Sequence, residues 1–144
     1  MPTWKHGICL LTALALLGLE QPARAGAFVI VVNKANSLSS ISSGDLKKAF
    51  TGGTKQWASG AVVQVGLIPS DAPETAYLSS LMSMTPRELI ARIQEQVFKG
   101  EMRRPVVLKS SQDCVAFARA NPGGVCVATA GQAIPPEANV IALQ

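Results

Sequence analysis

The sequence predicts a single α/β domain in which a mostly parallel or mixed sheet of five strands is flanked by helices. Short runs rich in β-branched residues alternate with amphipathic stretches of helical period along most of the chain. Gly, Pro or Ser clusters mark the boundaries between these segments. Such alternation is typical of domains whose helices cover both faces of a sheet.

The predicted strands differ in how strongly their patterns indicate burial. Residues 28–33 form a continuous apolar run, as expected of a strand that is buried on both faces of a parallel sheet. The other four predicted strands are residues 61–68, 105–109, 125–129 and 139–143.

Four helices are predicted between the strands, each from a start signal. Thr85 begins the clearest of them, because Pro86 follows at the first helical position and Glu88 completes a capping box. The expected N-caps are Ser42 or Ser43, Asp71, Thr85, and Ser110 or Ser111.

The first 25 residues are typical of a secretory signal peptide. A short basic start precedes the apolar run of residues 8–19, and Ala23-Arg24-Ala25 provides small residues for cleavage before Gly26. A retained membrane anchor needs roughly 20 apolar residues, and Glu20 ends this run too early. We therefore expect one domain, residues 26–144, that is periplasmic or secreted and does not span a membrane.

Removal of the leader would also remove the only histidine, His6. The remaining chain could not build a Ser-His-Asp triad, a Cys-His pair or a His-ligated metal site. We expect no catalytic residue, no metal, no cofactor and no enzymatic activity. The 13 Lys and Arg residues are scattered and not interleaved with aromatic residues, so nucleic acid is not an expected partner.

Two cysteines remain in the predicted mature chain, Cys114 and Cys126. An even count suits an oxidising compartment and indicates a disulfide. Two buried free thiols or a redox pair are the alternatives, although the spacing is not that of a Cys-x-x-Cys motif.

Four stretches, taken together, resemble the phosphate-type solute-binding proteins of ABC transporters, a periplasmic-binding-protein-like family. They are Asn33 to Asn36 after the first strand, the spaced set Leu46, Phe50, Gly52 and Trp57, Val97 to Gly100, and Asn121 to Val127. The resemblance implies a short member that corresponds to one lobe of the usual two. The family's Arg-x-x-x-Ser-Gly-Thr phosphate loop is replaced here by a stretch in which Ser70 and Thr75 are the possible hydroxyl donors.

Helix N-termini offer unpaired backbone N–H groups, so the chain could bind a small oxyanion without a metal. We expect two such ends at the carboxyl edge of the sheet, with a serine loop after the first strand as a third source of donors. The competing interpretation is that these hydroxyl groups only cap helices. The candidate ligand-binding residues are Ser39, Ser40, Ser70, Thr75, Ser110 and Ser111.

Two functions follow from these expectations. The first is an exported, non-enzymatic solute-binding domain for phosphate or another small oxyanion, serving uptake or sensing with a membrane transporter or receptor as partner. The second is a periplasmic interaction module without ligand binding, which docks a partner or self-associates through the face left open by the missing lobe.

Overall fold

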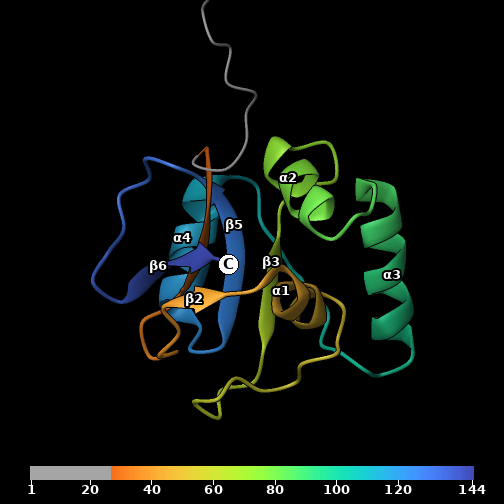
Figure 1. The fold of residues 1–144 in the computed structure, drawn as a ribbon, viewed down its shortest axis with the longest axis horizontal. Helices are drawn as coiled ribbons and strands as arrows, with labels where there is room; N and C mark the ends of the chain where they lie inside the picture. Colours follow the sequence, from red (N-terminus) through yellow and green to blue (C-terminus); the bar gives the residue numbers. More distant parts are fainter. Residues whose placement is uncertain (1–26) are drawn as a thin grey trace, which may run out of the picture.

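The computed structural model describes residues 27–144, which form a mixed sheet of six strands flanked by helices (Figure 1). The strands are β1 (Phe28–Asn33), β2 (Ser40–Ile41), β3 (Gln64–Leu67), β4 (Val106–Val107), β5 (Gly124–Thr129) and β6 (Ala138–Leu143). The helices are α1 (Ser43–Phe50), α2 (Pro73–Leu81), α3 (Pro86–Phe98) and α4 (Ser111–Ala120). The predicted signal peptide and its cleavage between Ala25 and Gly26 lie outside the described residues.

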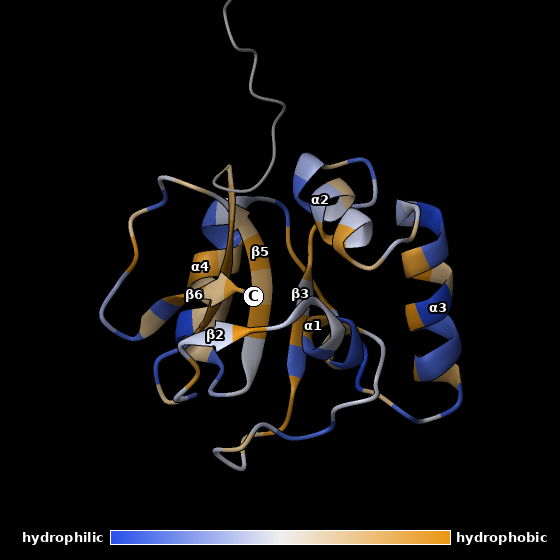
Figure 2. Cartoon of the chain, in the orientation of Figure 1, coloured by the Kyte–Doolittle hydropathy of each residue, from blue (hydrophilic) through white to orange (hydrophobic). Residues whose placement is uncertain are grey.

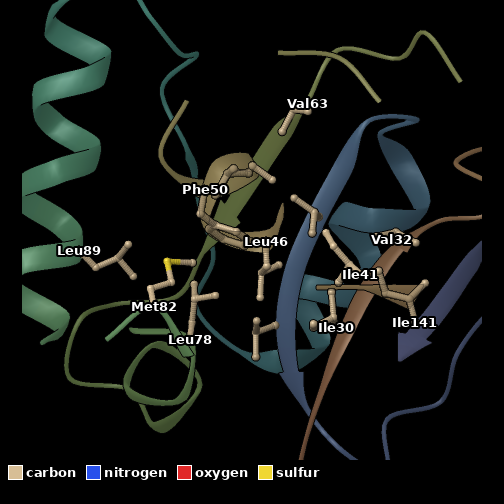
Figure 3. Close-up of a cluster of buried hydrophobic side chains, with 14 of the residues drawn as sticks. Ile30, Val32, Ile41, Leu46, Phe50, Val63, Leu78, Met82, Leu89 and Ile141 are labelled. Atoms are coloured by element: carbon tan, nitrogen blue, oxygen red, sulfur yellow. The ribbon is translucent and has the colours of Figure 1, made fainter. Parts of the chain in front are cut away.

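The sheet has the strand order β2-β6-β1-β5-β3-β4 and divides the core into two parts. On β1, Ile30 and Val32 pack on the side of α1, α2 and α3, whereas Val31 packs on the side of α4. The larger part includes Phe50 and Leu78 (Figure 3). Strands β1 and β5 are apolar over most of their length (Figure 2), as expected of strands covered on both faces.

The α/β architecture is confirmed, but the sheet has six strands and not the five expected. The additional strand is β2, which pairs in parallel with β6 and lies within the stretch expected to be a serine-rich turn. Strand β1 is antiparallel to both of its neighbours, β5 and β6. The apolar run therefore indicated burial on two faces correctly, while the parallel direction inferred from it was wrong.

Three of the four predicted helix starts are confirmed by their cap bonds. Ser42 accepts a hydrogen bond from the backbone N–H of Asp45, as Thr85 does from Glu88 and Ser110 does from Asp113. The fourth was wrong, since Ala72 and not Asp71 is the N-cap of α2 and makes no side-chain cap bond. Pro73 decides this position, because proline fits the first helical residue.

Two long-range contacts hold α4 and the turn after it against the sheet. Cys114 on α4 and Cys126 on β5 form the expected disulfide, with a Cα–Cα distance of 5.8 Å. Trp57 is buried and donates from Nε1 to the carbonyl of Gly123 at 2.9 Å. This bond joins the loop around Trp57 to the turn that precedes β5. Within residues 27–144, none of the helices is long and apolar enough to cross a membrane.

Candidate functional site

A groove of about 580 Å³ lies at the carboxyl edge of three parallel strands. Because β3 is parallel to both β4 and β5, the segments that follow these strands meet at one end of the sheet. Helix α2 lies at that end (Figure 1). The walls of this edge groove are the β3–α2 junction from Ile68 to Glu74 apart from Ser70, the start of α4 from Lys109 to Gln112, and Thr129 with Gln132.

The N-terminus of α2 opens into the edge groove without a side-chain cap. Its N-cap, Ala72, has no hydroxyl or carboxylate to accept from the first turn, and Pro73 has no N–H to offer. The backbone N–H groups of Glu74 and Thr75 have no acceptor within the helix. This end of α2 therefore presents two donors and the positive end of a helix dipole.

The side-chain hydroxyl of Thr75 is not among the donors at the N-terminus of α2. It is buried and donates to the carbonyl of Ile68 at 2.6 Å, which ties the first turn of α2 to the end of β3. Thr75 can therefore contribute only its backbone N–H to a ligand in the groove.

The start of α4 forms the opposite wall, and both of its serine side chains have internal partners. Ser110 Oγ accepts from the N–H of Asp113 at 3.3 Å, and Asp113 Oδ2 accepts from the N–H of Lys109 at 3.0 Å. Ser111 Oγ accepts from the N–H of Thr129 at 2.8 Å. The first-turn N–H groups of Ser111 and Gln112 have no acceptor within the helix, so here too the backbone supplies the donors.

The edge groove is lined by charges of both signs, some of which attract an anion and some of which repel it. Lys109 is the cation among its lining residues, and Asp71 and Glu74 are the two carboxylates. Glu74 is only 9% exposed and sits in the first turn of α2, where it stabilises the helix dipole but repels a second anion. The lining favours an anion only at the N–H groups of the two helix starts.

The structure brings some of the predicted site residues together and separates others. Ser110 and Ser111 line the edge groove, and Thr75 lies buried in the first turn of α2. Ser70 is exposed and lines two neighbouring grooves along α3. Ser39 and Ser40 lie at β2, the opposite margin of the sheet, where the carbonyl of Ser39 accepts from Ala142.

Sequence reasoning missed Lys109, Thr129 and Gln132 as lining residues. Thr129 could have been found, because it ends a predicted strand whose carboxyl end was expected at the same edge as the helix starts. Gln132 offers no such signal, since its position depends on its bond from Nε2 to Thr129 Oγ1 at 3.0 Å. Among residues 27–144, no three His, Cys, Asp or Glu side chains lie close enough to hold a metal ion.

Comparisons with known proteins give matches in structure only. No protein-family model and no curated protein sequence matches the chain. An ABC-type phosphate transport receptor from Vibrio cholerae superposes on 81% of this chain with a TM-score of 0.56 and 14% identity. PstS from Borrelia burgdorferi superposes on 82% with a TM-score of 0.59 and 15% identity.

A third match, from Clostridium perfringens, was solved with bound phosphate and is described as a phosphate ABC transporter substrate-binding protein. It superposes on 81% of this chain with a TM-score of 0.55 and 13% identity. The chain covers 46%, 47% and 44% of the three matched structures, about half of each. The fold is that of half a phosphate-binding receptor. At these identities the likeness establishes the fold alone, and the ligand is a separate question.

Proposed function

We propose that the protein is an exported, non-enzymatic binding domain that recognises phosphate or a similar small oxyanion in the edge groove. The observation that carries this proposal is the uncapped N-terminus of α2, which faces the same groove as the start of α4. The recognition chemistry is that of backbone N–H groups and helix dipoles, which need neither a metal nor a titrating side chain. The phosphate-related descriptions of two of the matched proteins, from Vibrio cholerae and Clostridium perfringens, support the choice of ligand.

The affinity is expected to be modest, because the groove has two carboxylates and one lysine. A bound phosphate would accept hydrogen bonds from the backbone N–H groups of Glu74 and Thr75 on one side and of Ser111 and Gln112 on the other. Lys109 would offset part of the repulsion from Asp71 and Glu74. Such a domain would serve uptake or sensing, with a membrane transporter or receptor as its partner.

Phosphate and sulfate are expected to raise the melting temperature of the protein in a saturable way. A ligand present at one hundred times its dissociation constant stabilises the folded state by about 2.7 kcal/mol. The measurement is a thermal-shift titration with phosphate and sulfate, and chloride at equal ionic strength separates binding from salt effects. A melting temperature that does not respond to either oxyanion would contradict the proposal.

A substitution at the α2 N-cap makes this titration specific for the edge groove. Ala72→Asp should supply the missing cap, stabilise the free protein by about 1 kcal/mol, and remove most of the phosphate response. Ala116→Asp makes the same charge change on the exposed surface of α4, outside the groove, and should leave the response intact. Equal phosphate responses in the two variants would place the bound anion elsewhere.

Removal of one carboxylate from the groove is expected to strengthen binding. Glu74→Gln keeps the size of the buried side chain but deletes its charge, so the dissociation constant for phosphate should fall by about tenfold, which corresponds to about 1.4 kcal/mol. Glu88→Gln, in the first turn of α3, is the matched control and should not change it. Isothermal titration calorimetry measures both, and weaker binding by the Glu74 variant would argue against an anion at this groove.

A further inference from the structure

A second groove, of about 600 Å³, runs between α3 and β4. Its wall on α3 includes Ile93, Val97 and Phe98, and its wall on the sheet includes Leu67 and Val107. Arg104 is the one charged residue among those that line it. Phe98 is 93% exposed and Val107 is 79% exposed, so the α3–β4 groove leaves two large apolar side chains in water.

The sheet beside this groove ends in a two-residue edge strand, which follows Pro105. β4 is the last strand in the sheet order and pairs only with β3 among the described strands. Leu108 donates its N–H to Leu67 on β3 at 2.9 Å. Because successive residues of a strand point their backbone groups to opposite sides, Val107 directs its N–H and C=O away from β3.

Free strand edges in soluble proteins are usually blocked by charged residues, proline or a covering segment. Here the two residues of β4 are both valine, with 41% of Val106 and 79% of Val107 exposed. An open hydrogen-bonding edge and an apolar groove therefore lie side by side, which is the combination that peptide-binding domains use for strand addition.

The charged residues near the groove indicate the sign of the charge that a partner would carry. Residues 103–109 contain Arg103, Arg104 and Lys109 and no carboxylate. Two acidic residues at the end of α3 and just after it, Glu95 and Glu101, are bound to Lys99 and Lys55 at 2.8 and 2.9 Å. Hydrogen bonds from these lysines lower the pKa of both carboxyl groups, so both acids remain ionised and paired. The arginines are left to meet an anionic group from outside.

We propose that the α3–β4 groove binds an extended, acidic peptide segment of a partner protein. The segment pairs with the outward N–H and C=O of Val107, inserts an apolar side chain between α3 and β4, and directs a carboxylate to Arg104. This docking site adjoins the edge groove, with which it shares Ile68 and Pro69 as lining residues, but its occupation does not require an oxyanion.

A second copy of the chain is a less suitable occupant of the same edge. Pairing of β4 with β4 of another copy would bring two sets of Arg103, Arg104 and Lys109 together without a single carboxylate from that stretch. Like charges across an interface oppose association, whereas an acidic segment in the groove gains from Arg104.

The test is selection from a displayed library of random peptides, followed by titration of a selected synthetic peptide with the protein. We expect selected sequences to combine acidic with β-branched or aromatic residues. Val107→Pro removes the outward N–H of β4 while it keeps an apolar residue in the groove, and it should weaken binding at least tenfold. Arg104→Glu should have a similar effect, and Arg92→Glu, an equal charge change at an exposed residue of α3 outside the groove, should leave binding within about twofold.

Four results would overturn this proposal. The first two are a library that yields no acidic sequences and a selected peptide that binds the Val107→Pro variant as tightly as the parent protein. The third is the formation of dimers that Val107→Pro abolishes, which would make a second copy of the chain the occupant. The fourth is binding of the protein to vesicles of anionic phospholipid through Phe98 and Arg104 without binding of any peptide. In each case the phosphate response of the edge groove is measured separately, so the two proposals stand or fall independently.

Discussion

Replacement of Gly123 by alanine is expected to cost at least about 4 kcal/mol of the free energy of unfolding, which is exceptional for a single methyl group. A Cβ atom at this position would lie 1.7 Å from the carbonyl oxygen of Val62 and 2.7 Å from its carbonyl carbon. Both are backbone atoms, so no side-chain rotation relieves the overlap. The segment at Val62, just before β3, and the turn at Gly123 would have to separate.

That separation would break more than the one contact. The carbonyl of Gly123 accepts from Trp57 Nε1 at 2.9 Å and from the backbone N–H of Gln64 at 2.9 Å. The turn thus joins the loop around Trp57, the start of β3 and the start of β5. Displacement of Gly123 leaves a buried indole N–H without its acceptor, which adds to the steric cost.

Urea unfolding, followed by far-ultraviolet circular dichroism, measures the effect of Gly123→Ala. Gly44→Ala is the matched control, because the nearest atom to a Cβ at Gly44, Ser42 Oγ, is 3.9 Å away. Gly44 lies in α1, where alanine is the better helix former, so this variant should be neutral or slightly more stable. Similar unfolding midpoints for the two variants would contradict the close approach of the turn to Val62.

Loss of the disulfide is the second large effect that we expect. Cys114 and Cys126 are 12 residues apart in sequence, and both are fully buried between α4 and β5. A bridge that closes a loop of this length stabilises the folded state by about 3 kcal/mol, mainly through constraint of the unfolded chain. The double variant Cys114→Ala with Cys126→Ala should therefore melt about 10 °C lower.

A reducing agent provides the control for this prediction. Dithiothreitol should lower the melting temperature of the parent protein towards that of the double variant and should leave the double variant unchanged. If reduction shifts neither protein, the two sulfurs are not bridged in solution and the account of α4 anchoring is wrong.

Features of the fold that depend on neighbouring residues could be predicted from the sequence. The caps at Ser42, Thr85 and Ser110 each need only a hydroxyl and an N–H three residues later. The N-cap of α2 was misplaced because Asp71 and Glu74 matched the capping pattern, whereas Pro73 fixed the helix start one residue later. The decisive signal, Pro73, was present in the local sequence, but it competed with the capping pattern at Asp71.

Features that depend on distant residues could not be predicted. β2 is a strand only because Ser40 and Ile41 pair with Ala142 and Leu143 on β6, about a hundred residues further along the chain. The direction of β1 is likewise set by its partners, since burial on two faces is the same for parallel and antiparallel neighbours.

The candidate site shows the same division between local and distant information. The starts of α2 and α4 lie at the end of the sheet where β3 and β4 finish, as expected, although the N-cap of α2 is Ala72 and not Asp71. The bond of Ser110 is a local cap and was predicted, whereas the bonds of Thr75 to Ile68 and of Thr129 to Ser111 join different segments and could not be foreseen. The proposed recognition therefore rests on the backbone N–H groups of the two helix starts, which the sequence analysis also expected, and not on the serine hydroxyl groups.

Titration of the backbone amide signals with phosphate, in two-dimensional ¹H–¹⁵N NMR spectra, tests this central claim most directly. The account predicts saturable shifts with one common dissociation constant at Glu74, Thr75, Ser111 and Gln112, the two helix N-termini that face the edge groove. Amide signals there that stay fixed while phosphate reaches high concentration, or shifts confined to Arg103 and its neighbours, would contradict it.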